Sequence, residues 1–361
     1  LMKLLQNIKF SAAILGLSTS LWASPKPNIL FIAIDDLKPT IGAYGSNVPT
    51  PAMDEIAAQG TTFMNAYCQQ AICGPSRASV MTGKYPDFTQ VWDLKTKIRD
   101  IHPNIITLTQ YFMKYGYHTA GIGKIFDPRS VGKEGDSASW SERFTQTWHL
   151  KYNAEIGKPI GHYHNPRSKN ISGGDKNASW NKVNKKLFAN NAWPAVEALD
   201  VADDAYDDGA IAAHAVKSLA KLAKKKNPFF LAVGFKKPHL PFVAPKKYWD
   251  IIDPNKIKLE PYQKKPQGAP NYATHDFSEL RSYNGIPRNG PIDPHIQRNL
   301  IHGYYACVAY IDAQIGKIID QLKKQGLEKN TVIVLWGDHG WHLGDHGLWC
   351  KHTNYEQATR V

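Results

Sequence analysis

Cysteine is scarce in this 361-residue sequence, and no long apolar run follows its N-terminal segment. The four cysteines form no CxxC pair, which argues against a zinc site built from thiolates; they are Cys68, Cys73, Cys307 and Cys350. Beyond residue 23 no stretch is a candidate for a transmembrane helix. The sequence also has no internal repeat, no low-complexity tract, no recognisable nucleic-acid motif and no HExxH motif. Zinc proteases of the HExxH kind are therefore not indicated.

Acidic residues are outnumbered, with 31 Asp and Glu against 44 Lys and Arg, for a net charge of +13. Such an excess favours a polyanionic partner, which is nucleic acid, anionic lipid or an acidic polysaccharide. Without a nucleic-acid motif, we predict no nucleic-acid partner. The hydrophobic content of 42% and the charged content of 21% are ordinary for a globular protein. The length suits one large domain or two smaller ones.

Residues 1–23 have the pattern of a secretory signal peptide. Lys3 and Lys9 supply positive charge, residues 11–21 are apolar or small, and Ala23 precedes Ser24. No cysteine stands at the predicted cleavage point, so a lipid anchor is not indicated. We therefore expect a periplasmic or secreted protein without a stable membrane span, and an uncleaved anchor is the alternative. In an exported protein four cysteines allow up to two disulfides.

A continuous apolar run predicts a buried parallel strand at residues 28–34, and three further strands are predicted at residues 118–123, 229–235 and 331–336. Helical patterns are predicted between them at residues 51–60 (capped by Thr50), 107–115, 200–226 and 298–325. This alternation predicts an α/β fold, with a largely parallel central sheet flanked by helices, over residues 24–361.

Two long segments lack a clear pattern. Residues 129–198 are a polar insertion whose tryptophans either stack on sugar rings or hold an irregular segment together; they are Trp140, Trp148, Trp180 and Trp193. Residues 244–297 are rich in proline and form a second excursion. An acidic cluster at residues 203–208 could be taken for a calcium site, but its position at a helix start is explained by the helix dipole.

Charged residues follow each predicted strand. Asp35 and Asp36 follow the first, Lys124 the second, His239 lies in the loop after the third, and Asp338 and His339 follow the fourth. In parallel sheets ligands bind beyond the carboxyl ends of the strands. Carboxylates gathered there predict a site for Ca²⁺ or Mg²⁺, since adjacent buried carboxylates repel each other unless a cation neutralises them. Two separate salt bridges are the alternative.

The segment Cys73-Gly74-Pro75-Ser76-Arg77 predicts a helix that begins at Cys73, because Pro75 suits a first turn. Free N–H groups at a helix N-terminus favour an anion. Arg77, one turn on, has a forked guanidinium suited to an oxyanion. A small buried cysteine beside a structural arginine is the alternative interpretation.

This segment resembles the Cys-X-Pro-Ser-Arg signature of type I sulfatases in the alkaline phosphatase superfamily. Residues 66–73 look most like the iduronate-2-sulfatase branch, and the resemblance covers nearly all of residues 26–361. It implies that a formylglycine-generating maturation enzyme oxidises Cys73 to formylglycine (3-oxoalanine), whose hydrated form is the nucleophile. It also implies one Ca²⁺ ion in a metal site formed by Asp35, Asp36, Cys73, Asp338 and His339. His339 is an unusual ligand for a hard cation and could instead hydrogen-bond the sulfate or the diol.

The resemblance assigns further roles. Lys124 and Lys351 match the sulfate-binding lysines, His239 matches the histidine that protonates the leaving alcohol, and Arg77 would steady the diol. The implied substrate is a sulfated carbohydrate. Asp127 departs from the pattern, which has a histidine there. The resemblance also implies a small C-terminal subdomain after the Asp-His-Gly segment, and we expect the residues up to Val361 to lack it.

Two other functions share part of this pattern. A phosphoric ester hydrolase of the same superfamily would use the same metal carboxylates. A catalytically silent protein that binds sulfated glycans would keep Cys73 as a thiol. The positive charge fits all three interpretations.

Overall fold

The computed structural model describes residues 26–172 and 180–361. The predicted signal peptide, residues 1–23, lies outside this range. Four parallel strands form the central sheet. In spatial order the strands are β2 (His118–Gly123), β4 (Phe229–Phe235), β1 (Asn28–Ile34) and β6 (Thr331–Gly337). β1 pairs with β4 on one side and with β6 on the other, and its residues are buried throughout. The predicted α/β fold is confirmed, and β6 is one residue longer than predicted.

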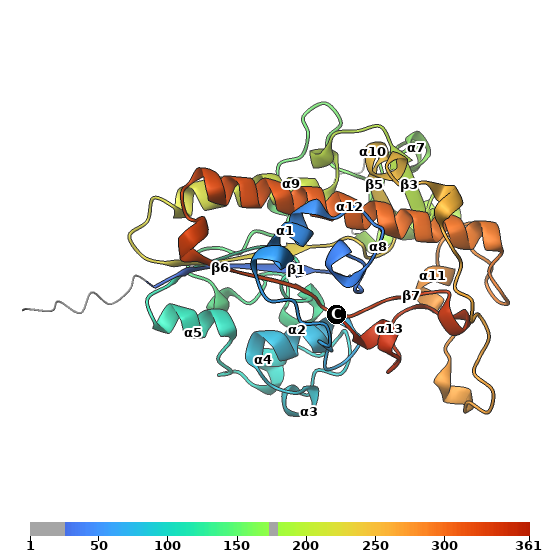
Figure 1. The fold of residues 1–361 in the computed structure, drawn as a ribbon, viewed down its shortest axis with the longest axis horizontal. Helices are drawn as coiled ribbons and strands as arrows, with labels where there is room; N and C mark the ends of the chain where they lie inside the picture. The colour runs from blue at the N-terminus through green and yellow to red at the C-terminus, as the bar shows by residue number, and fades with distance from the viewer. Residues whose placement is uncertain (1–25, 173–179) are drawn as a thin grey trace, which may run out of the picture.

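Helices cover both faces of this sheet (Figure 1). Alternate residues of β1 point to opposite faces, as the twofold strand period requires. Leu30, Ile32 and Ile34 belong to the core that includes α1 (Pro51–Gln59), α9 (Asp207–Leu222) and α12 (Pro294–Lys324). Ile29, Phe31 and Ala33 belong to the second core, which includes α2 (Cys73–Thr82) and α5 (Leu108–Lys114).

Shorter elements connect these layers. The remaining strands pair as β3 (Val196–Leu199) with β5 (Phe242–Pro245), parallel, and β7 (His342–Leu343) with β8 (Trp349–Cys350), antiparallel. The short helices are α3 (Pro86–Thr89), α4 (Ile98–Ile101), α6 (Pro128–Val131), α7 (Pro166–Ser172), α8 (Trp180–Ala189), α10 (Lys246–Asp250), α11 (Ser278–Arg281) and α13 (Glu356–Thr359). Single 3-10 turns occupy Gly42–Tyr44, Ser137–Ser139, Thr147–His149, Asp203–Ala205, Pro254–Lys256, Asn271–Ala273, Glu328–Asn330 and Asp345–Gly347.

The helix predicted at residues 200–226 begins later than its pattern suggests. Asp203 lies in a separate 3-10 turn, where its carboxylate pairs with Lys247 at 2.8 Å and with Lys317 at 2.5 Å. α9 starts at Asp207, which pairs with Lys236 at 2.6 Å. Lysines therefore neutralise these acidic residues, and the structure favours ion pairing over a calcium site there.

Two predicted helix starts also differ in detail. Thr50 is the N-cap residue of α1, but its hydroxyl bonds Asp54 at 3.1 Å instead of capping the helix N–H groups. α12 begins at Pro294, four residues before the predicted start. Asp293 caps it by accepting a hydrogen bond from the His295 N–H at 2.7 Å.

The tryptophans of the insertion mostly pack inward. Trp140 and Trp193 are buried, and the Trp193 ring stacks on Tyr283 with ring centroids 5.6 Å apart. Trp148 is half-exposed. The side chain of Trp180 lies outside the described residues. At Trp140 and Trp193 the packing role, not sugar stacking, is the one the structure shows.

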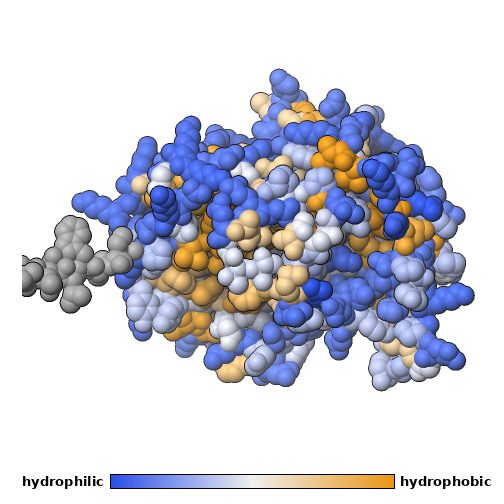
Figure 2. Space-filling view, viewed as in Figure 1, coloured by the Kyte–Doolittle hydropathy of each residue, from blue (hydrophilic) through white to orange (hydrophobic). Residues whose placement is uncertain are grey.

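β6 forms one edge of the sheet, and Val332 and Val334 on this strand are 47% and 37% exposed. Figure 2 shows apolar residues gathered over this strand on a face that is otherwise mostly hydrophilic. Within the described residues no helix has the length and apolar character needed to cross a membrane.

Gly234 allows the chain after β2 to cross the end of β4. A Cβ atom at this position would lie 2.0 Å from the backbone oxygen of Lys124. We expect Gly234→Ala to lower the free energy of unfolding in urea by about 3 kcal/mol, because backbone must move to accept the methyl group. Gly316→Ala on α12 is the matched control, since its Cβ would meet no atom closer than 3.5 Å. The control should be neutral or gain up to about 1 kcal/mol; equal stabilities of the two variants would contradict the prediction.

Candidate functional site

The carboxyl ends of β1, β2, β4 and β6 bring the predicted residues to one place. The residues after these strands contact one another and the N-terminus of α2, and the turn after β8 completes the group. Together these elements supply Asp35, Asp36, Cys73, Arg77, Lys124, His239, Asp338, His339 and Lys351.

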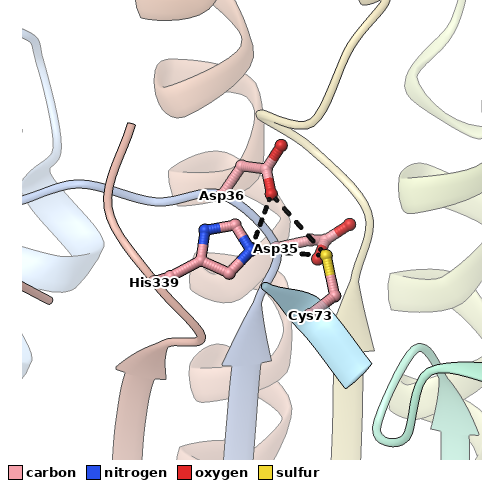
Figure 3. Close-up of side chains that lie close together, drawn as sticks. All are labelled: Asp35, Asp36, Cys73 and His339. Carbon is pink, nitrogen blue, oxygen red and sulfur yellow. Dashed lines mark hydrogen bonds and ion pairs between the residues drawn. The ribbon is translucent and has the colours of Figure 1, made fainter. Parts of the chain in front are cut away.

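Four of these side chains point toward one another, as Figure 3 shows. The ligand atoms of Asp35, Asp36, Cys73 and His339 all lie within 4.8 Å of one another, and all four residues are buried. The Cys73 Sγ lies 3.3 Å from His339 Nε2 and 4.0 Å from Asp36 Oδ1. This donor set could hold a metal ion, with two carboxylates as the hard ligands that Ca²⁺ and Mg²⁺ prefer.

The backbone after β1 turns sharply to place both carboxylates at this spot. Asp36 has a φ of +62°, a left-handed conformation that Asp tolerates better than most residues. Its N–H donates to Asp338 Oδ1 at 2.9 Å, which holds the turn against the end of β6. Strained backbone of this kind is common at functional sites.

Arg77 holds the carboxylates of the site. Its guanidinium is fully buried, and its Nε donates to Asp338 Oδ2 at 2.8 Å while its Nη2 lies 3.3 Å from Asp35 Oδ1. Its Nη1 donates to the backbone oxygens of Lys124 and Ile125. We predicted from the sequence that the fork suits an oxyanion, but most of its N–H groups are occupied by protein acceptors. Arg77 thus orients two acidic side chains and the chain after β2.

Asp338, also a predicted metal ligand, differs in position from the other four. Both of its oxygens have protein donors, which are the Asp36 N–H and the Arg77 guanidinium. It lies beside the four grouped ligand atoms, with Oδ1 3.7 Å from His339 Nε2. In this arrangement Asp338 positions the site, and it would need to share Oδ1 to coordinate a cation.

Two lysines flank the carboxylates. Lys124 Nζ lies 2.6 Å from Asp35 Oδ2, and Lys351 Nζ lies 3.0 Å from both oxygens of Asp36. Burial is the largest single effect and opposes their charge, but the negative neighbours, led by Asp35 for Lys124 and by Asp36 for Lys351, together outweigh it and raise the pKa of both lysines. Lys351 also lies 5.0 Å from the Trp341 ring centroid, a cation–π contact. Both lysines are therefore charged and suited to an anionic group.

His239 lies at the open side of the group. Its Nδ1 is 2.6 Å from the Leu240 carbonyl oxygen and its Nε2 is 3.9 Å from Asp36 Oδ2. Burial and Lys351 lower the pKa of His239 to about 3. An anion bound beside the ring would act in the opposite direction, because a nearby negative charge favours the protonated form.

Glu279 is a member of the site that sequence reasoning missed. Its carboxylate lies 3.2 Å from His239 Nε2 and 3.5 Å from Lys351 Nζ. Burial opposes ionisation, yet Lys351 and His239 lower the pKa of Glu279 to about 2. It lies on the four-residue helix α11, within the proline-rich stretch that has no periodic pattern, and only the positive φ of Phe277 before it marks the turn.

The two adjacent carboxylates differ in their electrostatics, and only that of Asp36 favours a further cation. Burial raises the pKa of Asp35, but Lys124, His239 and Arg77 outweigh it and hold the pKa well below its ordinary value. Burial together with the charges of Asp35 and Glu279 raises the pKa of Asp36 well above its ordinary value, despite Lys351. A divalent cation at the grouped ligand atoms would relieve this repulsion, so the residues fit such an ion.

Cys73 begins α2, as predicted, and is 1% exposed. Burial and the charge of Asp35 raise the pKa of its thiol well above the ordinary value. The thiol form therefore dominates, and an unmodified Cys73 is a poor nucleophile. All four cysteines are free thiols, so the disulfides that an exported chain allowed do not form here.

Asp127, where a histidine was expected, is buried, and both of its carboxylate oxygens accept hydrogen bonds. Arg129 contacts both of its oxygens, at 2.8 and 2.7 Å. Burial opposes ionisation, but Arg129 and Lys124 lower the pKa of Asp127 to about 2. This carboxylate is therefore ionised and cannot donate a proton.

Comparison with known proteins shows which family this chain belongs to. A family model described as "Sulfatase" matches residues 27–361. The chain belongs to the sulfatase family. It is similar to iduronate 2-sulfatase of Mus musculus, with 35% identity over 342 residues, which cover 92% of this chain and 58% of the relative. The chain thus spans less than two thirds of that relative.

Solved structures share the fold. A phosphonate monoester hydrolase of Agrobacterium radiobacter aligns with a TM-score of 0.63 and 20% identity, covering 93% of this chain and 67% of that one. A protein solved in complex with its substrate D-glucosamine-2-N,6-O-disulfate aligns with a TM-score of 0.63 and 19% identity, covering 93% and 70%. At these identities the likeness extends to the fold alone.

Proposed function

We propose that this chain is the catalytic part of a sulfatase that hydrolyses sulfate esters of a sulfated carbohydrate. The observation that carries the proposal is the convergence of Cys73 with Asp35, Asp36 and His339 between the buried Lys351 and the partly buried Lys124. A sulfate ester needs its oxygens neutralised and its leaving oxygen protonated, and this group of residues supplies both. The similarity to iduronate 2-sulfatase supports a carbohydrate substrate.

The proposal includes one Ca²⁺ ion and a formylglycine at position 73. Asp35, Asp36 and His339 would hold the ion together with residue 73, and Asp338 lies next to them. When present, the ion supplies charge stabilisation for the sulfate, and the hydrated aldehyde supplies an oxygen nucleophile where the buried thiol is a poor one.

The other residues act through their positions. The ammonium groups of Lys124 and Lys351 lie against the carboxylates that would hold the ion. A sulfate bound to that ion would therefore lie beside both lysines, which neutralise its oxygens. His239 protonates the leaving oxygen from the open side of the site, once the negative charge of the bound sulfate has raised its pKa enough to protonate the ring. Arg77 and Asp338 keep the carboxylates in place. Glu279 holds His239 and Lys351 through contacts at 3.2 and 3.5 Å.

We further propose that the protein is exported to the periplasm or secreted, and that a formylglycine-generating enzyme matures it. The charged N-terminal segment followed by an apolar run supports export. The Cys-X-Pro-Ser-Arg segment at the start of α2 supports maturation. The excess of 44 basic over 31 acidic residues supports an acidic polysaccharide or its oligosaccharides as substrate.

The competing function is hydrolysis of phosphate esters. Asp36, His239 and Glu279 form a second group that could hold a metal ion. The Lys351 ammonium lies 3.0 Å from Asp36 and 3.5 Å from Glu279, so it already supplies a positive charge to two members of that group. With Lys351 in this position we favour one ion and two lysines, and therefore sulfate hydrolysis over two-metal phosphate chemistry.

The test is a panel of sulfated mono- and oligosaccharides with matched phosphate esters, given to protein co-expressed with a maturation enzyme. Free sulfate and free phosphate are measured by ion chromatography. We expect kcat/KM for the best sulfate ester to exceed that of its phosphate counterpart by about 100-fold or more, a difference of roughly 3 kcal/mol in transition-state binding. Faster phosphate release would overturn the proposal. Binding of the sulfated sugars without release of sulfate would favour the silent glycan-binding protein.

A further inference from the structure

Asp127 and Arg129 form a fixed ion pair at the start of α6. The Asp127 side chain caps this helix by accepting the Arg129 N–H at 3.0 Å, and the same carboxylate receives Arg129 Nε at 2.8 Å and Nη2 at 2.7 Å. Two of these three contacts are made by the guanidinium, one to each carboxylate oxygen, and this two-point contact leaves it little freedom. The side chain of Asp127 is fully buried, whereas that of Arg129 is 51% exposed.

This pair continues an alternating row of charges that starts at the candidate active site. Asp35 Oδ2 contacts Lys124 Nζ at 2.6 Å, and Lys124 Nζ lies 3.9 Å from Asp127 Oδ2. Lys124 and Arg129 therefore share one carboxylate oxygen. The row runs from the buried metal ligands to a surface arginine, so Arg129 lies beside the group that is proposed to hold the sulfate.

Arg129 keeps donors available for another group. Only its Nε and one Nη2 hydrogen are needed for Asp127, out of five N–H donors. Within residues 26–172 and 180–361, no protein acceptor is in hydrogen-bonding range of Arg129 Nη1. A planar guanidinium held at a fixed angle is suited to two-point contact with a carboxylate or a sulfate.

We propose that Arg129 is a specificity-determining residue that binds a second oxyanion of the substrate, next to the sulfate that is cleaved. This inference rests on the proposed function. The second oxyanion is a carboxylate or another sulfate, on the same sugar or on its neighbour, because Arg129 and the sulfate-binding Lys124 flank a single carboxylate oxygen. Asp127 positions Arg129.

The test compares three disaccharides that carry the same cleavable sulfate. One has a uronic acid carboxylate, the second has that carboxylate reduced to an alcohol, and the third has a second sulfate in place of the carboxylate. The main variant is the double substitution Asp127→Asn with Arg129→Gln, which removes the pair without leaving a buried charge unpaired. Asp127→Asn alone retains the arginine.

Lys226→Gln is the charge-matched control. This exposed lysine precedes the start of β4, at the end of the sheet opposite the site. We expect the double variant to lose about 10-fold or more of the preference for one or both dianionic disaccharides over the reduced one, mainly through KM. The single variant should retain more of this preference, and the control all of it. An equal loss on all three disaccharides, or no loss, would overturn the inference.

Binding separates this inference from the proposed function. The same disaccharides are titrated calorimetrically into protein carrying Cys73→Ala, with and without the double substitution. If no sulfate ester is hydrolysed but the dianionic sugars still bind about 10-fold more tightly through Arg129, the proposed function fails and this inference stands. If hydrolysis occurs and neither binding nor turnover distinguishes the sugars through Arg129, only this inference fails.

Discussion

A Cys73→Ala variant is expected to release no measurable sulfate from a substrate that the wild-type protein hydrolyses. The expected loss in kcat/KM is at least about 10⁴-fold, because the nucleophile itself is removed while the binding groups remain. Cys73→Ser should be equally inactive when the co-expressed maturation enzyme acts on a cysteine thiol, since the serine hydroxyl then stays unoxidised. Sulfate release by ion chromatography is the measurement.

Controls for this prediction separate chemistry from folding and from maturation. Cys307→Ala changes another fully buried cysteine, on α12, which contacts the Val243 carbonyl oxygen at 3.6 Å and lies outside the candidate site. It should retain most of the activity. The intact mass of the peptide around Cys73 shows whether the thiol has become an aldehyde in each preparation. Near-normal turnover by Cys73→Ala would exclude a nucleophile at this position.

The central strands could be predicted almost to the residue. Strands buried on both faces must be apolar at every position, so β1 and β4 appear as uninterrupted apolar runs. The side chains that follow the strands could be assigned to one site because the carboxyl ends of parallel strands lie at one edge of the sheet. Lys351 lies farther along the chain and was included through resemblance alone.

Other parts depend on tertiary contacts that no local pattern records. Glu279 belongs to a proline-rich segment, and its place beside His239 follows from how α11 packs near β8. The role of Arg77 depends on which acceptors surround it, because a sequence shows the guanidinium and not its partners. The pairing of Asp127 with Arg129 has a local signal, an acid two residues before an arginine, but such spacings are common in loops.

The start of α9 shows how tertiary ion pairs compete with a local sequence pattern. Four aspartates before an apolar helical pattern complement the dipole at a helix N-terminus, which favours an early start near residue 200. Lys247 and Lys317 instead draw Asp203 into a separate turn. Ion pairs with other helices therefore decide where this helix begins.

Ca²⁺ is expected to stabilise the folded protein, and Asp36→Asn is expected to abolish that effect together with activity. At a concentration 100 times its dissociation constant, a bound ion adds about 2.7 kcal/mol, which is a rise in Tm of roughly 3–6 °C in a chain of this size. The physical reason is that Asp36 is buried beside other carboxylates. Burial and the negative charge of Asp35 raise the pKa of Asp36, and a bound cation would offset both effects. Differential scanning fluorimetry of protein treated with a chelator, with and without added Ca²⁺, is the measurement.

Asp312→Asn provides the matched control for this stabilisation. Asp312 is a buried carboxylate on α12 that accepts the Met53 N–H at 2.8 Å, away from the candidate site. Its variant should be less stable than the wild type but should show the same rise in Tm with Ca²⁺. Asp36→Asn keeps Lys351 paired with Glu279, so its folded state remains accessible to the test. A full Ca²⁺ response in Asp36→Asn would mean that the ion binds elsewhere, and the single-ion site between Asp35, Asp36 and residue 73 would then be wrong.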